Sequence, residues 1–269
     1  MFIDGDFFES LSDISFGDPY TKLILPTKEY IEYEVRNIEH TPILYIDTNR
    51  LPLLLRVAST INRDFKIITH NSDTTFDDVI IKFIPKNVIS VWCQNYTGID
   101  NKKIKPLPIG LERKLWFPEQ KKQNVIINNM NSDGERINKI YMNFSPNTNP
   151  IRRDWFNHLK DKSYVDAEML GNGSNYESYI SNLKKYKFVV SPPGNGIDCH
   201  RNWECLYVGA IPIIKKSNFT IDMFSDTPAI LVGDYDTINE DIIENYNGDG
   251  SLEKLTTDYW ENKIKSDVK

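Results

Sequence analysis

Short apolar runs alternate with segments of helix length along most of this chain, and this alternation limits the fold more than any other feature. In the first half, a helix-length segment at 51–61 follows the first of four strand-like runs, at 43–47, 65–70, 88–94 and 104–110. The second half restarts the pattern, with strand-like runs at 140–144, 163–169, 187–191, 211–216 and 229–235 and helix-like segments at 150–160, 175–187 and 198–209. Continuous apolar strands separated by helices are typical of parallel sheets covered on both faces. The pattern predicts an α/β protein with two such sheets.

A two-domain organisation fits the length of the chain. Its 269 residues exceed one average core and suffice for two small α/β domains with a cleft between them. From 112 to 139 the alternation dissolves into a segment rich in Asn and charge, as expected of a hinge or crossover. We therefore expect Rossmann-like domains at 1–115 and 139–269, joined by a linker at 116–138, with the last helix packing back on the first domain.

Charge and composition exclude several classes of protein. With 32 basic against 38 acidic residues and a net charge of -6, the chain has no overall field to attract nucleic acid, so any phosphate must meet a local site. The three cysteines match neither a disulfide framework nor a metal motif, which favours a reducing compartment. The N-terminus lacks the basic start of a signal peptide, and no apolar run approaches the ~18 residues of a membrane span. We expect a cytoplasmic protein without a membrane span.

The segment 191–214 carries the most specific chemical signal. A buried strand ends at Ser191, a Pro/Gly loop follows, and a helix is predicted to begin near Asp198. Backbone N–H groups and the positive end of the helix dipole then point out of the carboxyl edge of the sheet, an arrangement suited to an anion. Gly194 and Gly196, on either side of Asn195, have no Cβ atom where a phosphate must approach the backbone. Asp198 is a candidate ligand residue here, or the N-cap of the helix.

Three side chains in the first turns of that helix complete the candidate anion site. His200 and Arg201 can donate hydrogen bonds to a diphosphate, Arg in bidentate fashion. Glu204 lies four residues after His200 and so on the same helical face, where it can accept hydrogen bonds from ribose hydroxyls. A metal site formed by Asp198, His200 and Glu204 is the alternative, but zinc sites favour other spacings.

The same segment resembles the signature of exostosin-type glycosyltransferases, P-x-G-x-G-x-D-x-x-R-x-W-E-x-L-x-x-G-x-I-P, which binds the nucleotide-sugar donor. The matching residues are Pro193, Gly194, Gly196, Asp198, Arg201, Trp203, Glu204, Leu206, Gly209, Ile211 and Pro212. The resemblance implies the GT-B architecture of two Rossmann-like domains facing across a cleft, with the donor on the second domain and the acceptor on the first. It also implies that Arg201 contacts the diphosphate and Glu204 the ribose.

Further candidate donor-binding residues come from the loop after the strand at 140–144 and from the helix that begins near residue 175. Asn149, Arg152 and Arg153 follow that strand and are expected at the same cleft, where at least one arginine touches phosphate. Two exposed arginines on a helix face are an equally good interpretation. Tyr176 can stack on the base, although a surface tyrosine is the simpler interpretation.

In the first half, His70 and Asp73 stand at the end of the strand-like run 65–70. Transfer with inversion needs a base that takes the proton of the acceptor hydroxyl, and a carboxylate or imidazole at a strand's carboxyl end can serve. Asp73 is the first candidate and His70 the second. The alternative is that the segment 70–73 is a helix N-cap turn.

The resemblance implies a specific activity for the chain, which is similar to the compact members encoded by large DNA viruses of algae, one of them a xylosyltransferase. A sugar, such as xylose, would pass from a nucleotide-diphosphate sugar, UDP-linked rather than GDP-linked, to a glycan hydroxyl, with inversion and without a metal or other cofactor. A viral protein of this kind would act in the host cytoplasm. One alternative is a non-catalytic nucleotide- or sugar-binding module. Another is a metal-dependent, single-sheet (GT-A) enzyme that uses the D-x-D pair Asp234 and Asp236.

Overall fold

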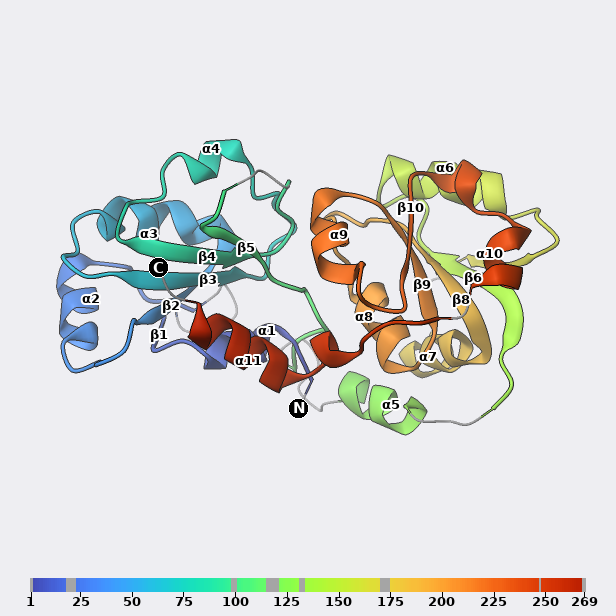
Figure 1. Cartoon of the computed structure of the whole chain (residues 1–269), viewed down its shortest axis with the longest axis horizontal. Coiled ribbons are helices and arrows are strands. Elements are labelled where there is room, and N and C mark those ends of the chain that lie inside the picture. The colour runs from blue at the N-terminus through green and yellow to red at the C-terminus, as the bar shows by residue number, and fades with distance from the viewer. Residues whose placement is uncertain are drawn as a thin grey trace.

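The computed structural model describes residues 2–17, 23–97, 101–114, 121–130, 134–169, 175–246 and 248–267. Figure 1 shows two lobes side by side, each built around one five-stranded sheet. Every strand pair in both sheets is parallel. The predicted α/β class with two parallel sheets is therefore confirmed.

The first sheet has the strand order β1-β2-β3-β4-β5, the same as the order in the chain. Its strands are β1 (Ile14–Ser15), β2 (Ile43–Asp47), β3 (Phe65–His70), β4 (Val88–Cys93) and β5 (Ile104–Pro106). The run expected as a strand at 104–110 pairs only as far as Pro106, and Pro108 has no N–H to continue the ladder. The lobe's helices are α1 (Gly5–Ser10), α2 (Lys28–Val35), the 3-10 turn η1 (Thr48–Arg50), α3 (Leu51–Ala58) and α4 (Asp78–Ile81).

The second sheet has the order β10-β9-β8-β6-β7, so the order in which successive strands are added to the sheet reverses between β6 and β8. Its strands are β6 (Ile137–Phe144), β7 (Val165–Met169), β8 (Tyr186–Ser191), β9 (Ile211–Lys215) and β10 (Ile230–Val232). Its helices are α6 (Pro150–Leu159), α7 (Tyr176–Lys185), α8 (His200–Tyr207), α9 (Asn218–Phe224) and α10 (Glu240–Asn245), with 3-10 turns η3 (Tyr235–Thr237) and η4 (Glu253–Leu255). In such sheets, ligands bind at the carboxyl ends of the strands where the order reverses. The fold thus singles out the ends of β6 and β8.

Alternate residues of the β6 strand divide the core of the second lobe between two hydrophobic clusters, as the period of two in a strand requires. Ile140, Met142 and Phe144 pack with Trp155 of α6 on one face. Tyr141 faces the opposite way and belongs to a larger cluster that continues through α8 and α9 into the first lobe. The two lobes therefore share apolar packing at their junction.

The region expected as a linker, 116–138, includes a helix, α5 (Lys121–Asn129). Ile126 of this helix is fully buried, and the neighbouring Val125 and Met130 are partly buried against the same core, so these apolar side chains anchor the helix. Among the described residues of this region, α5 packs against α7, so a helix lies where the sequence predicted a hinge or crossover.

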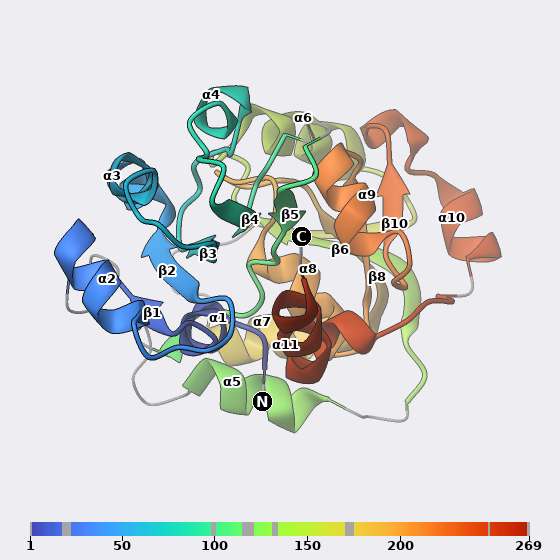
Figure 2. The ribbon, with the colours of Figure 1, turned by 60° about the vertical axis from the view of Figure 1, so that its left-hand side comes forward.

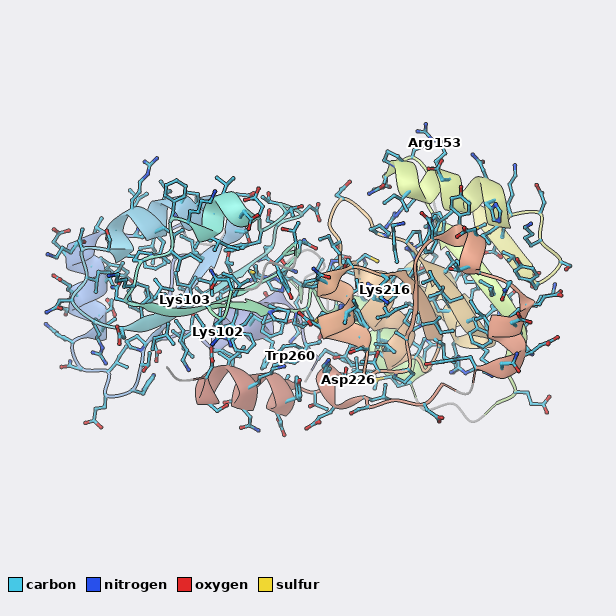
Figure 3. The ribbon with its side chains drawn as sticks, turned by 45° about the horizontal axis from the view of Figure 1, so that its top comes forward. Lys102, Lys103, Arg153, Lys216, Asp226 and Trp260 are labelled. Atoms are coloured by element: carbon cyan, nitrogen blue, oxygen red, sulfur yellow. The ribbon has the colours of Figure 1, made fainter. Side chains whose placement is uncertain are left out.

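The last helix, α11 (Thr257–Ser266), returns to the first lobe and lies beside α1 (Figure 2). Trp260, labelled in Figure 3, is fully buried, and its ring meets Phe8 edge to face with 6.1 Å between centroids. The buried ammonium of Lys66 donates to the carbonyls of Ile264 and Lys265 at 2.7 and 3.0 Å. A cation at a helix C-terminus is stabilising, so α11 is held by both charge and packing.

Polar contacts join the two lobes close to the start of α8. Asp198 Oδ2 accepts from the backbone N–H of Ile109 at 2.9 Å, and the Asp198 N–H donates to Asn95 Oδ1 at 2.9 Å. His200 Nδ1 lies 2.8 Å from the carbonyl of Gly110. These bonds fix the loop before α8 against the carboxyl edge of the first sheet.

Candidate active site

The loop between β8 and α8 leaves the amino end of α8 open. Cys199 is the N-cap residue, and its side chain accepts from no backbone N–H of the helix. The helix begins at His200, two residues later than predicted. The first N–H groups of an α-helix have no partner within the helix, and together they favour a negative charge. This helix end lies beside β8, next to the point where the strand order reverses.

Arg201 is a buried cation without a complete set of partners. Its side chain is 9% exposed, and its Nε and Nη1 atoms are buried without a hydrogen-bond partner. The guanidinium carbon lies 5.6 Å from the ring centroid of Phe144, the last residue of β6. Buried guanidinium N–H groups without hydrogen-bond partners are costly, which indicates a site built for an anion.

Arg152 brings a second guanidinium to the same aromatic ring. Its guanidinium carbon lies 5.8 Å from the Phe144 centroid, and its Nε donates to the carbonyl of Pro193 at 2.9 Å. Burial, and after it the charge of Arg201, lowers the pKa of Arg152. Two like charges converge here, and an anion with several oxygens would satisfy both.

The other residues proposed to bind the donor near the loop between β8 and α8 add no further charge to the site. Asn149 caps α6 through its Oδ1 and donates from Nδ2 to the carbonyl of Gly194 at 2.7 Å. A Cβ atom on Gly194 would lie 2.9 Å from Arg152 Nη2, so glycine lets this arginine approach the loop. Asn195 is exposed at the tip of the loop. Arg153 is exposed on α6 and points away from the body of the molecule (Figure 3), so it is not brought to the site.

Gly196 lies at the junction between the lobes, where the absence of a Cβ atom leaves room for Asn95. A Cβ atom there would lie 2.6 Å from Asn95 Nδ2, and Asn95 holds both Ser72 and the loop before α8. Asp198 is buried and accepts from four donors, which are the N–H groups of Ile109 and Cys199 and the side chains of Asn202 and Trp203. Through these bonds Asp198 joins the loop before α8 to the first lobe, and the N-cap position that the sequence suggested for Asp198 is occupied by Cys199.

Glu204 is held by two tyrosines of α7. Tyr176 Oη donates to Oε1 at 2.8 Å, and Tyr179 Oη donates to Oε2 at 3.0 Å. Burial, reinforced by the carboxylate, raises the pKa of both hydroxyls. Each carboxylate oxygen retains a second lone-pair site that can accept from a ligand hydroxyl. The Lys122 ammonium lies 4.8 Å from the Tyr176 ring centroid, which leaves this ring less free to stack on a base.

A cavity of about 270 Å³ lies between the lobes, directly beside the first residue of α8. It is lined by His70, Asp73 and His200 together with residues of the loop after β5. Because a carbonyl can only accept, His200 Nδ1 must be the protonated nitrogen that donates to Gly110. In the neutral ring Nε2 is then a proton acceptor. His200 thus qualifies as a general base, a role that sequence reasoning did not give it.

The two predicted base candidates differ in their surroundings. Asp73 is exposed on the rim of the cavity. His70 is 1% exposed, its Nε2 lies 3.1 Å from the carbonyl of Pro108, and its Nδ1 lies 2.9 Å from Asn71 Oδ1. Both ring nitrogens are occupied within the protein, and this argues against His70 as the base.

The D-x-D alternative is inconsistent with the fold and with the contacts of its aspartates. A single-sheet enzyme is excluded by the two separate sheets. Asp234 accepts from Trp155 Nε1, the Tyr235 N–H and Lys215 Nζ, and so holds η3 in place, while Asp236 is exposed. Within the described ranges, no group of three or more His, Cys, Asp or Glu side chains could hold a metal ion.

No family model matches the chain, and no curated protein matches its sequence. Similar solved structures include an alpha1,3-fucosyltransferase, with 13% identity and a TM-score of 0.45 over 95% of this chain and 90% of that one. Two trehalose-phosphate synthases are also similar. The Burkholderia multivorans structure has 7% identity and a TM-score of 0.41 over 88% of this chain and 71% of its own, and the UDP-forming Burkholderia xenovorans structure has 8% and 0.42 over 89% and 69%. Among the residues described, no helix has the length and apolarity to cross a membrane.

Some residues of the site carried a signal in the sequence that was not used. Tyr179 lies three residues after Tyr176, a spacing that places both on one face of a helix. Phe144 is the last residue of a buried strand, beside the loop with the two arginines. Gln94 directly follows β4, where polar residues at a carboxyl edge indicate ligand contacts.

Proposed function

We propose that this protein is a glycosyltransferase that takes its sugar from a nucleoside diphosphate sugar. The observation that carries the proposal is the pair of buried guanidiniums, Arg201 and Arg152, at the switch point of the second sheet. A diphosphate offers oxygens for both cations and for the open amino end of α8. Glu204, with lone pairs still available, stands one turn further along α8, where a ribose would follow the diphosphate.

The transfer step follows from these positions. An acceptor hydroxyl attacks the anomeric carbon from the side opposite the diphosphate, and the new C–O bond forms as the old one breaks. The electron pair of the broken bond goes to the diphosphate oxygen, whose charge Arg201 and Arg152 stabilise. The hydroxyl proton goes to a base on the inter-lobe cavity, where Asp73 is the first candidate and His200 replaces His70 as the second.

Metal independence, inversion and the identity of the donor and acceptor are supported by different observations. Two fixed guanidiniums supply the positive charge that a metal ion would bring to the leaving group, which supports metal-independent transfer. Asp73, on the first lobe and so across the cavity from the diphosphate site of the second lobe, supports inversion. The preference for a UDP-linked pentose such as xylose, and for a glycan acceptor, rests on the resemblance of 191–214 to the exostosin signature.

A panel of UDP- and GDP-linked sugars tests the proposal in two steps. Thermal shift should identify the donor, since a ligand at ~100 times its Kd stabilises the folded state by ~2.7 kcal/mol. Mass spectrometry should then detect the released nucleotide and the transferred sugar, with and without EDTA. A donor that binds but is neither transferred nor hydrolysed would favour a non-catalytic binding module, and stabilisation by none of the panel would contradict the proposal.

A further inference from the structure

We propose that the inter-lobe cavity is a subsite for one neutral sugar ring and that Gln94 recognises two of its hydroxyls. This inference rests on the proposed function and adds a specificity-determining residue to it. Gln94 lines the cavity and is 2% exposed. Neither its Nε2 nor its Oε1 has a hydrogen-bond partner within the protein.

An unpartnered buried amide is rare because it loses its hydrogen bonds to water and gains none in return. Gln94 also lies beside a cavity, where a ligand can restore those bonds. A buried polar group that only a ligand can satisfy is a mark of a binding site.

Two residues near the cavity have an unusual backbone conformation. Among the described residues, the non-glycine residues with positive φ are Asn71 at 61° and Asn95 at 52°. They follow the adjacent strands β3 and β4 at the carboxyl edge, and Asn71 lines the cavity itself. Asn95 turns its side chain to Ser72 and to the second lobe, while the preceding residue, Gln94, lines the cavity. Conformations of this kind persist where the surroundings impose them, commonly at functional sites.

The chemistry of the cavity favours a neutral polyol. A side-chain amide both donates and accepts, as a pair of neighbouring sugar hydroxyls does. The charged groups on the wall do not favour a second anion, because Arg113 is paired with Asp6 and Glu9 and the carboxylate of Asp73 stands on the rim. The volume of about 270 Å³ lies just below the ~300–1,000 Å³ range of ligand pockets, which suits a single ring.

The ring in this cavity is next to the reacting centre. His200 lines the cavity, and the following residue, Arg201, belongs to the proposed diphosphate site. The occupant is therefore either the sugar of the donor or the first ring of the acceptor. Both sources present the same hydroxyl chemistry to Gln94, and the experiment distinguishes them.

The test compares Gln94→Met with Ser90→Ala in the full chain. Methionine keeps the length of glutamine and removes both hydrogen-bonding groups. Ser90 lies on β4, the strand that Gln94 directly follows, and its buried Oγ also lacks a partner, but it does not line the cavity. Neither substitution should lower the Tm, since each removes an unsatisfied polar group. Gln94→Glu, which keeps the shape and loses the donor, replaces Gln94→Met if the latter does not fold.

Two measurements follow on each variant. Calorimetry compares the affinity of UDP with that of UDP-linked glucose, galactose, N-acetylglucosamine and xylose. Saturation-transfer NMR measures binding of the same free sugars to the UDP-saturated protein. We expect Gln94→Met to weaken one of these two interactions about tenfold, as the loss of one to two neutral hydrogen bonds predicts, with UDP affinity unchanged. An effect on the UDP-sugar assigns the ring to the donor, and an effect on the free sugar assigns it to the acceptor.

The inference is overturned if UDP binds and Gln94→Met changes neither interaction, or if Ser90→Ala weakens sugar binding equally. If neither UDP nor GDP binds the wild-type protein, the proposed function itself fails, which is a distinct result.

Discussion

Replacing Arg201 by methionine should separate binding from stability in a way that few core substitutions do. Methionine fills the same elongated space beside Phe144 and removes a buried charge whose Nε and Nη1 atoms have no partner. It also removes the repulsion felt by Arg152. Each unsatisfied buried group costs about 1–3 kcal/mol, so the ligand-free variant should be as stable as the wild type or more so.

Nucleotide binding should change in the opposite direction. A charge-assisted hydrogen bond contributes ~1.5–3 kcal/mol, and at ~1.4 kcal/mol per tenfold its loss weakens binding roughly 10- to 150-fold. The buried setting of Arg201 places the effect toward the upper end, because no water can replace the guanidinium there.

Calorimetry with UDP, GDP and inorganic pyrophosphate measures the affinity, and urea unfolding measures the stability of the ligand-free protein. Arg153→Met is the matched control, since Arg153 is exposed on the same helix as Arg152 and should affect neither quantity. A variant of Arg201 that is clearly less stable yet binds nucleotide normally would refute the reasoning, because the guanidinium would then be a structural group.

Four further substitutions test other parts of the site and the fold. Asp73→Asn should lower turnover about 10²–10⁴-fold with donor affinity intact if Asp73 is the base, and near-normal turnover would transfer that role to His200, tested as His200→Gln in the same assay. Gly196→Ala should destabilise the fold by roughly 1–3 kcal/mol in urea unfolding, since the added Cβ would lie 2.6 Å from Asn95 Nδ2. An unchanged urea midpoint would mean that the residues at the junction move aside at no cost in stability. Burial lowers the pKa of His70 from 6.5 to about 4, so the unfolded chain binds the extra proton first and stability should fall by about 3 kcal/mol as the pH drops from 6.5 to 4. His70→Gln should flatten that part of the pH profile, and a profile identical to the wild type would show that His70 does not titrate in this way.

The central strands could be predicted closely from the sequence because they are buried on both faces. The expected bounds of β2 and β3 are those in the structure, since short runs rich in apolar and β-branched residues are typical of buried parallel strands. The helix α5 was not predicted because its apolar residues, Val125, Ile126, Ile127 and Met130, form one short cluster within a segment rich in Asn and charge. Local composition there indicates a loop, and only packing against the second lobe makes it a helix.

For the site, the sequence indicated the correct strand, loop and helix but not the partners of each side chain. Arg201 could be proposed from its place in the first turn of a helix, a purely local argument. The role of Asp198 could not, because its partner Ile109 is 89 residues away in the chain. The orientation of His200 depends in the same way on a carbonyl from the other lobe, that of Gly110. Long-range contacts of this kind leave no trace in the spacing of residues.

The return of α11 to the first lobe also governs the order in which the protein can fold as it is made. The first lobe is synthesised first, yet Trp260 and the carbonyls that receive Lys66 come from the last turns of the chain. A nascent chain that has left the ribosome only as far as α10 would therefore hold a first lobe in which Phe8 of α1 and Lys66 of β3 lack their partners. Domains usually fold in turn from the N-terminus during synthesis. Here the lobe that emerges first is completed only after α11 has been synthesised.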